Sequence, residues 1–203
     1  VLKIPIVNHI HGAEWDTFYI DASEKSRKLK QVILEKCSRV IVLSDDWREK
    51  LEDVIDAELI SVVPNYSLLS SENRNVCKKE QNTVLFLGFL SERKGCYDIP
   101  RIVAQVQKEV EDVLFVLAGS GNADDVHLIL ELVKKEKVME HISFPGWVRN
   151  QQKKELLQNA AVFFLPSYAE GMPMSILEAM GYGLPIVSSN VGGIPELVEQ
   201  GRN

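Results

Sequence analysis

Residues 166–187 read PSYAEGMPMSILEAMGYGLPIV, and this stretch decides the fold. The apolar run that precedes it, Ala160 to Leu165, is typical of a buried strand. A short turn follows, and Pro173 suits the first position of a helix, where its missing N–H costs nothing. The glycines Gly181 and Gly183 end that helix before a second apolar run begins. Strand, tight loop, helix and strand in this order form the repeating unit of a parallel sheet.

Two carboxylates occupy contrasting places in this stretch. Glu170 lies in the loop before the helix, and Glu178 lies inside the helix. The loop presents unpaired backbone N–H groups and the positive end of the helix dipole, which suit an anion such as phosphate. Glu178 gains nothing from the dipole, so we interpret it as a hydrogen-bond acceptor for a ligand hydroxyl. A helix-capping Glu170 and a solvated Glu178 are the alternative interpretation.

The two glutamates and their flanking residues Gly171, Pro173 and Gly183 resemble the donor-site signature of the retaining glycosyltransferases of family 4. The resemblance implies an α/β fold of Rossmann-like parallel sheets with flanking helices, arranged as the two-domain B-type glycosyltransferase fold. It also implies an enzyme of the hexosyltransferase type. Such an enzyme transfers a sugar from a nucleotide sugar to an acceptor, with retention of anomeric configuration, as in polysaccharide or glycolipid biosynthesis.

Apolar runs alternate with helical patterns along the whole chain, as expected for an α/β protein. We expect residues 1–66 to form the last part of an acceptor-side domain and the polar residues 67–82 to form a linker. Residues 83–203 then form the donor-binding domain. Because the chain opens directly on an apolar run without Met, we expect a fragment that is truncated at both ends.

The expected elements are short and regularly spaced, which favours βα units over other classes. The expected strands lie at 2–7, 39–43, 59–63, 84–87, 113–118, 141–144, 162–165 and 184–187. The expected helices lie at 23–37, 47–53, 97–110, 124–137, 151–159, 174–180 and 194–199, with Ser44 as a helix cap.

Loops that follow parallel strands meet at one edge of the sheet, where ligands bind. The loop after residues 84–87 contains Gly88, Arg93 and Lys94, and such cations can hold a diphosphate by charge-assisted hydrogen bonds. A solvated turn is the alternative. The resemblance assigns Lys94 to the diphosphate. The family often has Arg directly after the first glycine, where this chain has Phe89, so we expect Arg93 to substitute.

The resemblance implies roles for the other donor-binding residues. Glu170 would hold sugar hydroxyls, Glu178 would accept hydrogen bonds from the ribose, and the base would lie near the backbone of Val148. Backbone groups would complete the pocket and stabilise the departing diphosphate; these belong to Gly119, Gly171, Met172, Pro173 and Met174.

A histidine before glycine follows the first expected strand. The family commonly carries His-Gly at this place, facing the donor sugar, so we assign that role to His11, with His9 as a weaker second. The catalytic candidates are therefore Glu170, Lys94 and His11.

Composition excludes several classes. The 203 residues carry a formal net charge of −6, which does not suit nucleic-acid binding. No apolar run reaches the length of about 18 residues that a membrane span needs. Cys37, Cys77 and Cys96 lack the spacing of a metal site and suit reduced thiols in the cytoplasm. We expect no metal or other cofactor, and a cytoplasmic location that includes the inner face of the membrane.

The expected partners are a UDP-, GDP- or ADP-linked sugar and an acceptor glycan or lipid-linked sugar. Two alternatives stay open: a fragment that binds nucleotide sugar without activity, and a sugar-nucleotide epimerase on the same fold. A dinucleotide oxidoreductase is disfavoured, because Gly119-Ser120-Gly121 is not followed by the third glycine that its fingerprint requires.

Overall fold

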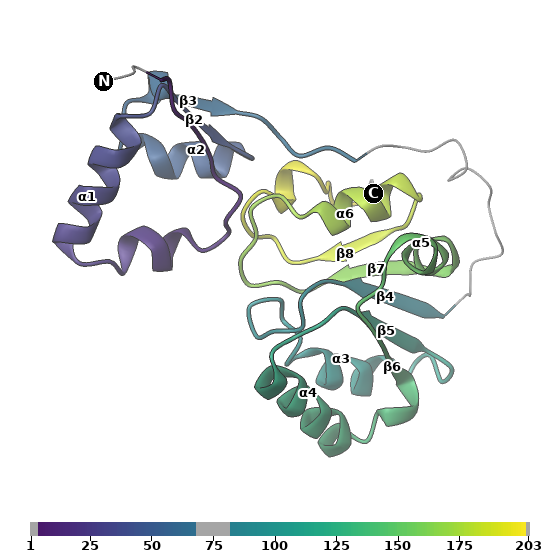
Figure 1. Ribbon diagram of the computed structural model, residues 1–203. Coiled ribbons are helices and arrows are strands. Elements are labelled where there is room, and N and C mark those ends of the chain that lie inside the picture. Colours follow the sequence, from purple (N-terminus) through teal and green to yellow (C-terminus); the bar gives the residue numbers. More distant parts are fainter. Residues whose placement is uncertain (1–3, 68–81, 202–203) are drawn as a thin grey trace. The chain divides into compact units, whose positions relative to one another are not determined.

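Two separate parallel sheets, each with flanking helices, make up the computed structural model, which describes residues 4–67 and 82–201 (Figure 1). The chain divides into two units. The first unit contains Val1–Tyr66, Ala169–Pro173 and Asn190–Leu197, and the second contains the rest of the chain. The predicted linker lies outside the described residues except at its two ends, and so does Cys77. The predicted α/β class with parallel sheets and flanking helices is confirmed.

The first unit has a three-stranded sheet in the order β1-β2-β3. Its elements are β1 (Val7–His9), η1 (Asp16–Ile20, π-helical), α1 (Glu24–Glu35), β2 (Arg39–Val42), α2 (Asp45–Glu52), η2 (Ala57–Leu59, 3₁₀) and β3 (Ile60–Val62). Ser44 caps α2 as predicted, because its Oγ accepts a hydrogen bond from the N–H of Trp47 at 3.3 Å. Trp15, Val40 and Leu51 belong to its buried core.

The second unit has a five-stranded sheet in the order β6-β5-β4-β7-β8. Its elements are β4 (Thr83–Leu87), α3 (Ile99–Val106), β5 (Leu114–Ala118), α4 (Ala123–Glu136), η4 (Met139–His141, 3₁₀), β6 (Ile142–Gly146), α5 (Asn150–Asn159), β7 (Val162–Leu165), α6 (Met174–Gly181) and β8 (Ile186–Ser188). The 3₁₀ turn η5 (Ile194–Glu196) follows β8 in the chain and belongs to the first unit. Figure 1 shows α3 and α4 on one face of the sheet and α5 and α6 on the other. Both faces are therefore covered, which explains the nearly continuous apolar strands.

Two predicted elements differ from the structure. Within the described residues the opening strand covers Val7–His9 rather than residues 2–7, and its pairing with β2 begins at Val7 and Arg39. Directly before it, the Ile6 carbonyl accepts a hydrogen bond from the Ser38 N–H at 2.7 Å. The predicted helix at 194–199 is a 3₁₀ turn, Ile194–Glu196, which closes when the Leu197 N–H bonds the Ile194 carbonyl. Pro173 lies directly before α6 rather than at its first position.

Candidate functional site

The carboxyl ends of the five parallel strands in the second unit lie along one sheet edge. β4 is central, with β5 on one side and β7 on the other. The chain runs outward from β4 through β5 and β6, and then returns to the other side of β4 through β7. Because the strand order reverses beside β4, the loop after this strand opens at the point where α/β sheets bind ligands.

The loops after β4 and β5 are joined by close backbone contacts. A Cβ atom at Gly119 would lie only 1.7 Å from the carbonyl oxygen of Gly88, so no larger residue fits there. The Gly88 N–H bonds the Ala118 carbonyl at 3.1 Å, and the Leu90 N–H bonds the Ser120 carbonyl at 2.7 Å. The structure thus brings together Gly88 and Gly119, which the sequence predicted separately.

The cations Arg93 and Lys94 lie in a loop that is held against the end of β7. Gly95 has a φ of +72°, and a Cβ atom there would lie 2.0 Å from the carbonyl oxygen of Pro166. The Arg93 carbonyl accepts a hydrogen bond from the Tyr168 N–H at 2.8 Å. Both cationic side chains are half-buried. The backbone therefore fixes the loop that carries these two cationic residues at the centre of the carboxyl edge.

Tyr168 and Ser167, which sequence reasoning missed, lie beside this cationic loop. The Tyr168 hydroxyl donates a hydrogen bond to Asp98, and this bond, with the negative charge of Asp98, raises the pKa of the phenol. The Ser189 hydroxyl donates to the Ser167 carbonyl. Among the described residues, the buried Oγ of Ser167 has no hydrogen-bond partner. Only the three-dimensional packing reveals that orphaned hydroxyl.

Glu178, the predicted ribose acceptor, forms an ion pair. Its Oε1 accepts from the Nζ of Lys153, on α5, at 2.7 Å. About a quarter of the Glu178 side chain is exposed (27%), so the carboxylate remains accessible. Lys153 was not predicted from the sequence, because it lies 25 positions away in a helix that resembles any polar helix. The pair orients the carboxylate toward α5.

The remaining predicted residues of the second unit differ in exposure. Val148 is buried, which leaves its backbone rather than its side chain for any contact with a base. Its neighbour Trp147 is exposed, with the Arg149 guanidinium 5.9 Å from a ring centroid. Met174, the first residue of α6, is also exposed.

Glu170 to Pro173 belong to the first unit and are buried. A Cβ atom at Gly171 would lie 3.2 Å from the Gly12 carbonyl oxygen, so this loop lies beside the predicted His11-Gly12 pair. A Cβ atom at Gly192, which has a φ of +53°, would lie 1.8 Å from the Glu170 carbonyl oxygen. The backbone of the loop is thus tightly packed.

Two further side chains hold segments of the first unit in place. Asn65 donates from Nδ2 to the Met172 carbonyl at 2.8 Å. The Glu196 carboxylate accepts from the N–H groups of Asp45 and Asp46, at 2.9 and 3.2 Å. A carboxylate suits this place because the N-terminus of α2 carries partial positive charge. Glu196 is therefore a structural residue, and neither contact could be predicted from local sequence.

His9 and His11 lie at the end of β1 with their ring centroids 4.0 Å apart. Partial burial, and next the neighbouring imidazole of His11, lower the pKa of His9.

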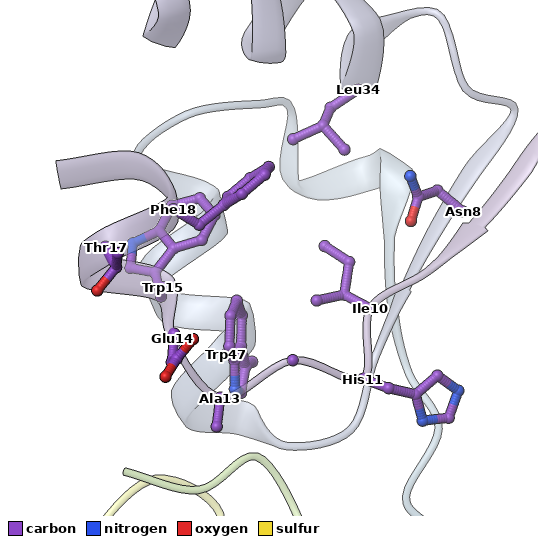
Figure 2. Close-up of a pocket in the computed structure, with 11 residues that line it drawn as sticks. Asn8, Ile10, His11, Ala13, Glu14, Trp15, Thr17, Phe18, Leu34 and Trp47 are labelled. Atoms are coloured by element: carbon purple, nitrogen blue, oxygen red, sulfur yellow. The ribbon is translucent and has the colours of Figure 1, made fainter. Parts of the chain in front are cut away.

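A hollow of about 560 Å³ lies in the first unit, between β1, η1 and α1 (Figure 2). Its larger apolar lining residues are Ile10, Trp15, Phe18, Leu34 and Trp47, and its polar ones are Asn8, His11, Glu14 and Thr17. Among the described residues that line it, His11 is the only one that the sequence predicted as functional. The other predicted residues lie elsewhere in their units.

The described ranges contain no group of three or more His, Cys, Asp or Glu side chains arranged to hold a metal ion. Within residues 4–67 and 82–201, no helix combines the length and the apolar character that crossing a membrane requires.

The family described as glycosyl transferases group 1 has a model that matches residues 81–203. The 2-deoxystreptamine N-acetyl-D-glucosaminyltransferase of Niallia circulans is 26% identical over 99% of this chain and 56% of its own length. The gpi3 subunit of the phosphatidylinositol N-acetylglucosaminyltransferase of Schizosaccharomyces pombe is 28% identical over 85% of this chain and 38% of its own length. The chain spans about half the length of the curated relatives it matches.

Solved structures of two proteins with bound UDP share the fold. HepE of Anabaena, solved with UDP and glucose, has a TM-score of 0.80 at 22% identity, over 97% of this chain and 56% of that protein. A mutant of TarM from S. aureus, solved with Fondaparinux, α-GlcNAc-glycerol and UDP, has a TM-score of 0.79 at 21% identity, over 98% of this chain and 40% of that protein.

Proposed function

Because the chain belongs to the family of group 1 glycosyl transferases, we propose that it carries the donor-binding part of an enzyme that transfers a sugar from a nucleotide sugar to an acceptor. The observation that carries the proposal is the cationic loop of Arg93 and Lys94, fixed where the strand order of the second sheet reverses. Helix N-termini and cations at such an edge suit a diphosphate.

We propose that Lys94 binds the diphosphate. The family often has an arginine where this chain has Phe89, and we propose that Arg93 makes the contact that this arginine would make. The glycines Gly88 and Gly119 are proposed to form a backbone wall of the donor pocket, because their close packing, with a Cβ atom at Gly119 only 1.7 Å from the Gly88 carbonyl oxygen, excludes larger residues. The Val148 backbone is proposed to contact the base. The carboxylate of Glu178, which Lys153 orients, is proposed to accept hydrogen bonds from the ribose hydroxyls.

The proposed reaction retains the anomeric configuration and needs no protein nucleophile. The bond between the anomeric carbon and the diphosphate oxygen breaks, and the departing diphosphate keeps the electron pair. The acceptor hydroxyl attacks from the same face and gives its proton to the departing phosphate oxygen. Lys94 and the N–H groups of residues 171, 172 and 174 stabilise the developing negative charge, while Pro173 positions the start of α6. Glu170 holds the sugar hydroxyls, and His11 faces the sugar.

The solved relatives with UDP favour a UDP-linked sugar as the donor. We propose that binding needs no metal, because cations and helix N-termini supply the positive charge. The relative that is named for phosphatidylinositol favours a lipid-linked acceptor, and the one that is named for 2-deoxystreptamine favours a small polyol.

Isothermal titration of UDP, GDP and ADP against the 203-residue chain in EDTA tests the proposal. We expect UDP to bind, and we expect Lys94→Ala to weaken it by about tenfold or more, since a hydrogen bond to a charged group contributes about 1.5–3 kcal/mol. Lys108→Ala, an exposed lysine of the same unit, is the matched control. If no nucleotide binds, the proposal is wrong; if binding requires added metal, the metal-free part is wrong.

A further inference from the structure

The hollow of the first unit has no role in the donor chemistry described above, although its walls are held firmly. The Trp15 ring stacks on Tyr19, with centroids 4.8 Å apart, and forms a T-shaped pair with the Trp47 ring at a centroid distance of 5.5 Å. Both tryptophans are only 4% exposed, so neighbouring side chains fix their orientation. The walls are thus interlocked aromatic rings that cannot easily rotate into the space.

The lysine Lys30 ties the two helical walls of the hollow together. Its ammonium donates a hydrogen bond to the Phe18 carbonyl and lies 4.2 Å from the centroid of the Phe18 ring. Phe18 lies on η1 and Lys30 lies on α1, so this double contact holds η1 at a set distance from α1. The space between them is preserved by a specific interaction.

The interior of the hollow suits an apolar group. In Figure 2 the side chains of Ile10, Phe18 and Leu34 point toward one another across it, while the imidazole of His11 points away. Sugar hydroxyls placed there would lose their hydrogen bonds to water without replacement. The volume, about 560 Å³, lies in the range of small-molecule sites, about 300–1,000 Å³. Apolar cavities far smaller than this bind ring-sized apolar molecules.

We propose that this hollow binds the apolar aglycone of the acceptor, such as an alkyl or aryl group attached to a hydroxylated head. The inference rests on the proposed function. Asn8, Glu14 and Thr17 are polar members of the lining and can bond the head. His11 is also a lining residue, although its imidazole points away from the space, so the head of a bound acceptor lies near the chain segment that carries His11 (Figure 2).

A second apolar surface on α1 provides the control. Leu29, Val32 and Ile33 are 62%, 44% and 53% exposed, so this surface also attracts alkyl groups. None of the three lines the hollow. The same substitution at Ile10 and at Ile33 therefore separates binding in the hollow from adsorption on α1.

Saturation-transfer NMR with octyl β-D-glucoside, below its micelle-forming concentration, tests the proposal, with glucose as the polar control. We expect saturation on the octyl methylenes and at most a tenth of it on free glucose. Ile10→Trp, which fills the hollow, reduces the octyl signal at least fivefold, and Ile33→Trp leaves it within a factor of two. The reverse pattern, or equal saturation of glucose, overturns the proposal.

A measurement on the unaltered protein guards against a misfolded Ile10→Trp. Two of the three tryptophans, Trp15 and Trp47, line the hollow, and Trp147 belongs to the other unit. We expect octyl glucoside to shift the indole N–H signals of Trp15 and Trp47 and to leave that of Trp147 in place. A shift of Trp147 alone, or no shift, overturns the proposal. UDP binding in the same samples tests the proposed function separately: UDP binding without octyl binding overturns only the aglycone site.

Discussion

Ser167 carries a polar hydroxyl in a buried position that offers it no hydrogen-bond partner among the described residues. Its side chain is 1% exposed, and within the described ranges its Oγ has no hydrogen-bond partner. A buried hydroxyl without a partner costs about 1–3 kcal/mol. Its neighbour Ser189 is the opposite case, because its hydroxyl donates to the Ser167 carbonyl. The two serines form a matched pair in the second unit.

We predict that Ser167→Ala leaves the free energy of unfolding of the second unit unchanged or raises it by about 1 kcal/mol, since it removes an unsatisfied group. Ser189→Ala should lower the same quantity by about 1 kcal/mol, because it removes a hydrogen bond. Urea unfolding of both variants measures the two changes. A larger loss for Ser167→Ala than for Ser189→Ala would mean that the Ser167 hydroxyl is bonded in solution.

The two glutamates of the defining stretch differ at the same scale. Glu178 is partly exposed and paired with Lys153, whereas Glu170 is 6% exposed in a tightly packed loop. We predict that Glu178→Ala weakens UDP and UDP-sugar alike, by about ten- to a hundredfold, because a hydrogen bond to a charged group contributes about 1.5–3 kcal/mol. Glu170→Ala should weaken only the UDP-sugar. Calorimetric titration of both ligands gives the four affinities.

Lys153→Ala is the control for the Glu178 prediction. The ion pair is partly exposed, so its loss should cost only about 0.2–1 kcal/mol of stability. A smaller loss of UDP affinity than in Glu178→Ala is expected, since the carboxylate is still present. Equal losses of both ligands in Glu170→Ala would show that Glu170 does not contact the sugar.

At the scale of elements, α2 depends on two caps, one from the residue directly before it and one from a distant part of the chain. Ser44 bonds the N–H of Trp47, and Glu196 bonds the N–H groups of Asp45 and Asp46. Together they satisfy three of the four N–H groups that an isolated helix leaves unpaired. Both caps belong to the first unit. The helix is eight residues long, so its first turn is a large part of it.

We predict that Ser44→Ala and Glu196→Ala each lower the free energy of unfolding of the first unit by about 1 kcal/mol. Hydrogen exchange separates the two caps: Glu196→Ala should accelerate exchange at Asp45 and Asp46, and Ser44→Ala should accelerate it at Trp47. Ser23→Ala, at the exposed cap of α1 with a longer 3.4 Å bond, is the control and should cost less. Unchanged exchange at Asp45 in Glu196→Ala would show that the cap does not form in solution.

At the scale of the whole molecule, each sheet has its own buried side chains. Val40 and Leu51 are fully buried in the first unit, and Leu85 and Phe163 are fully buried in the second. The cationic loop belongs to the second unit. A ligand stabilises the part of a protein that must be folded to bind it, by about 2.7 kcal/mol at a hundred times its Kd.

We predict that UDP at this concentration slows hydrogen exchange at β4 and β5 far more than at β2. Ser167→Ala should leave this difference intact, whereas Lys94→Ala should reduce it. Equal protection of β2 and β4 would show that the two units open as one, which would contradict the prediction.

The sequence by itself determined the parallel α/β class and nearly every element, because apolar periodicity, glycine and proline act over a few neighbouring residues. It also indicated the glycines Gly88 and Gly119 and the cations Arg93 and Lys94, since ligand loops follow strand ends. It misplaced the strand at Val7–His9 and the helix at residues 194–199, where partners decide the boundaries.

Tertiary structure alone decided which distant groups meet. The pairs Lys153 with Glu178 and Glu196 with the N–H of Asp45 join residues 25 and 151 positions apart, and no local pattern marks either of them. The orphaned hydroxyl of Ser167 and the hollow behind Ile10 depend on what packing leaves unfilled. Such features arise from the sum of many long-range contacts, which a local pattern of residues does not encode.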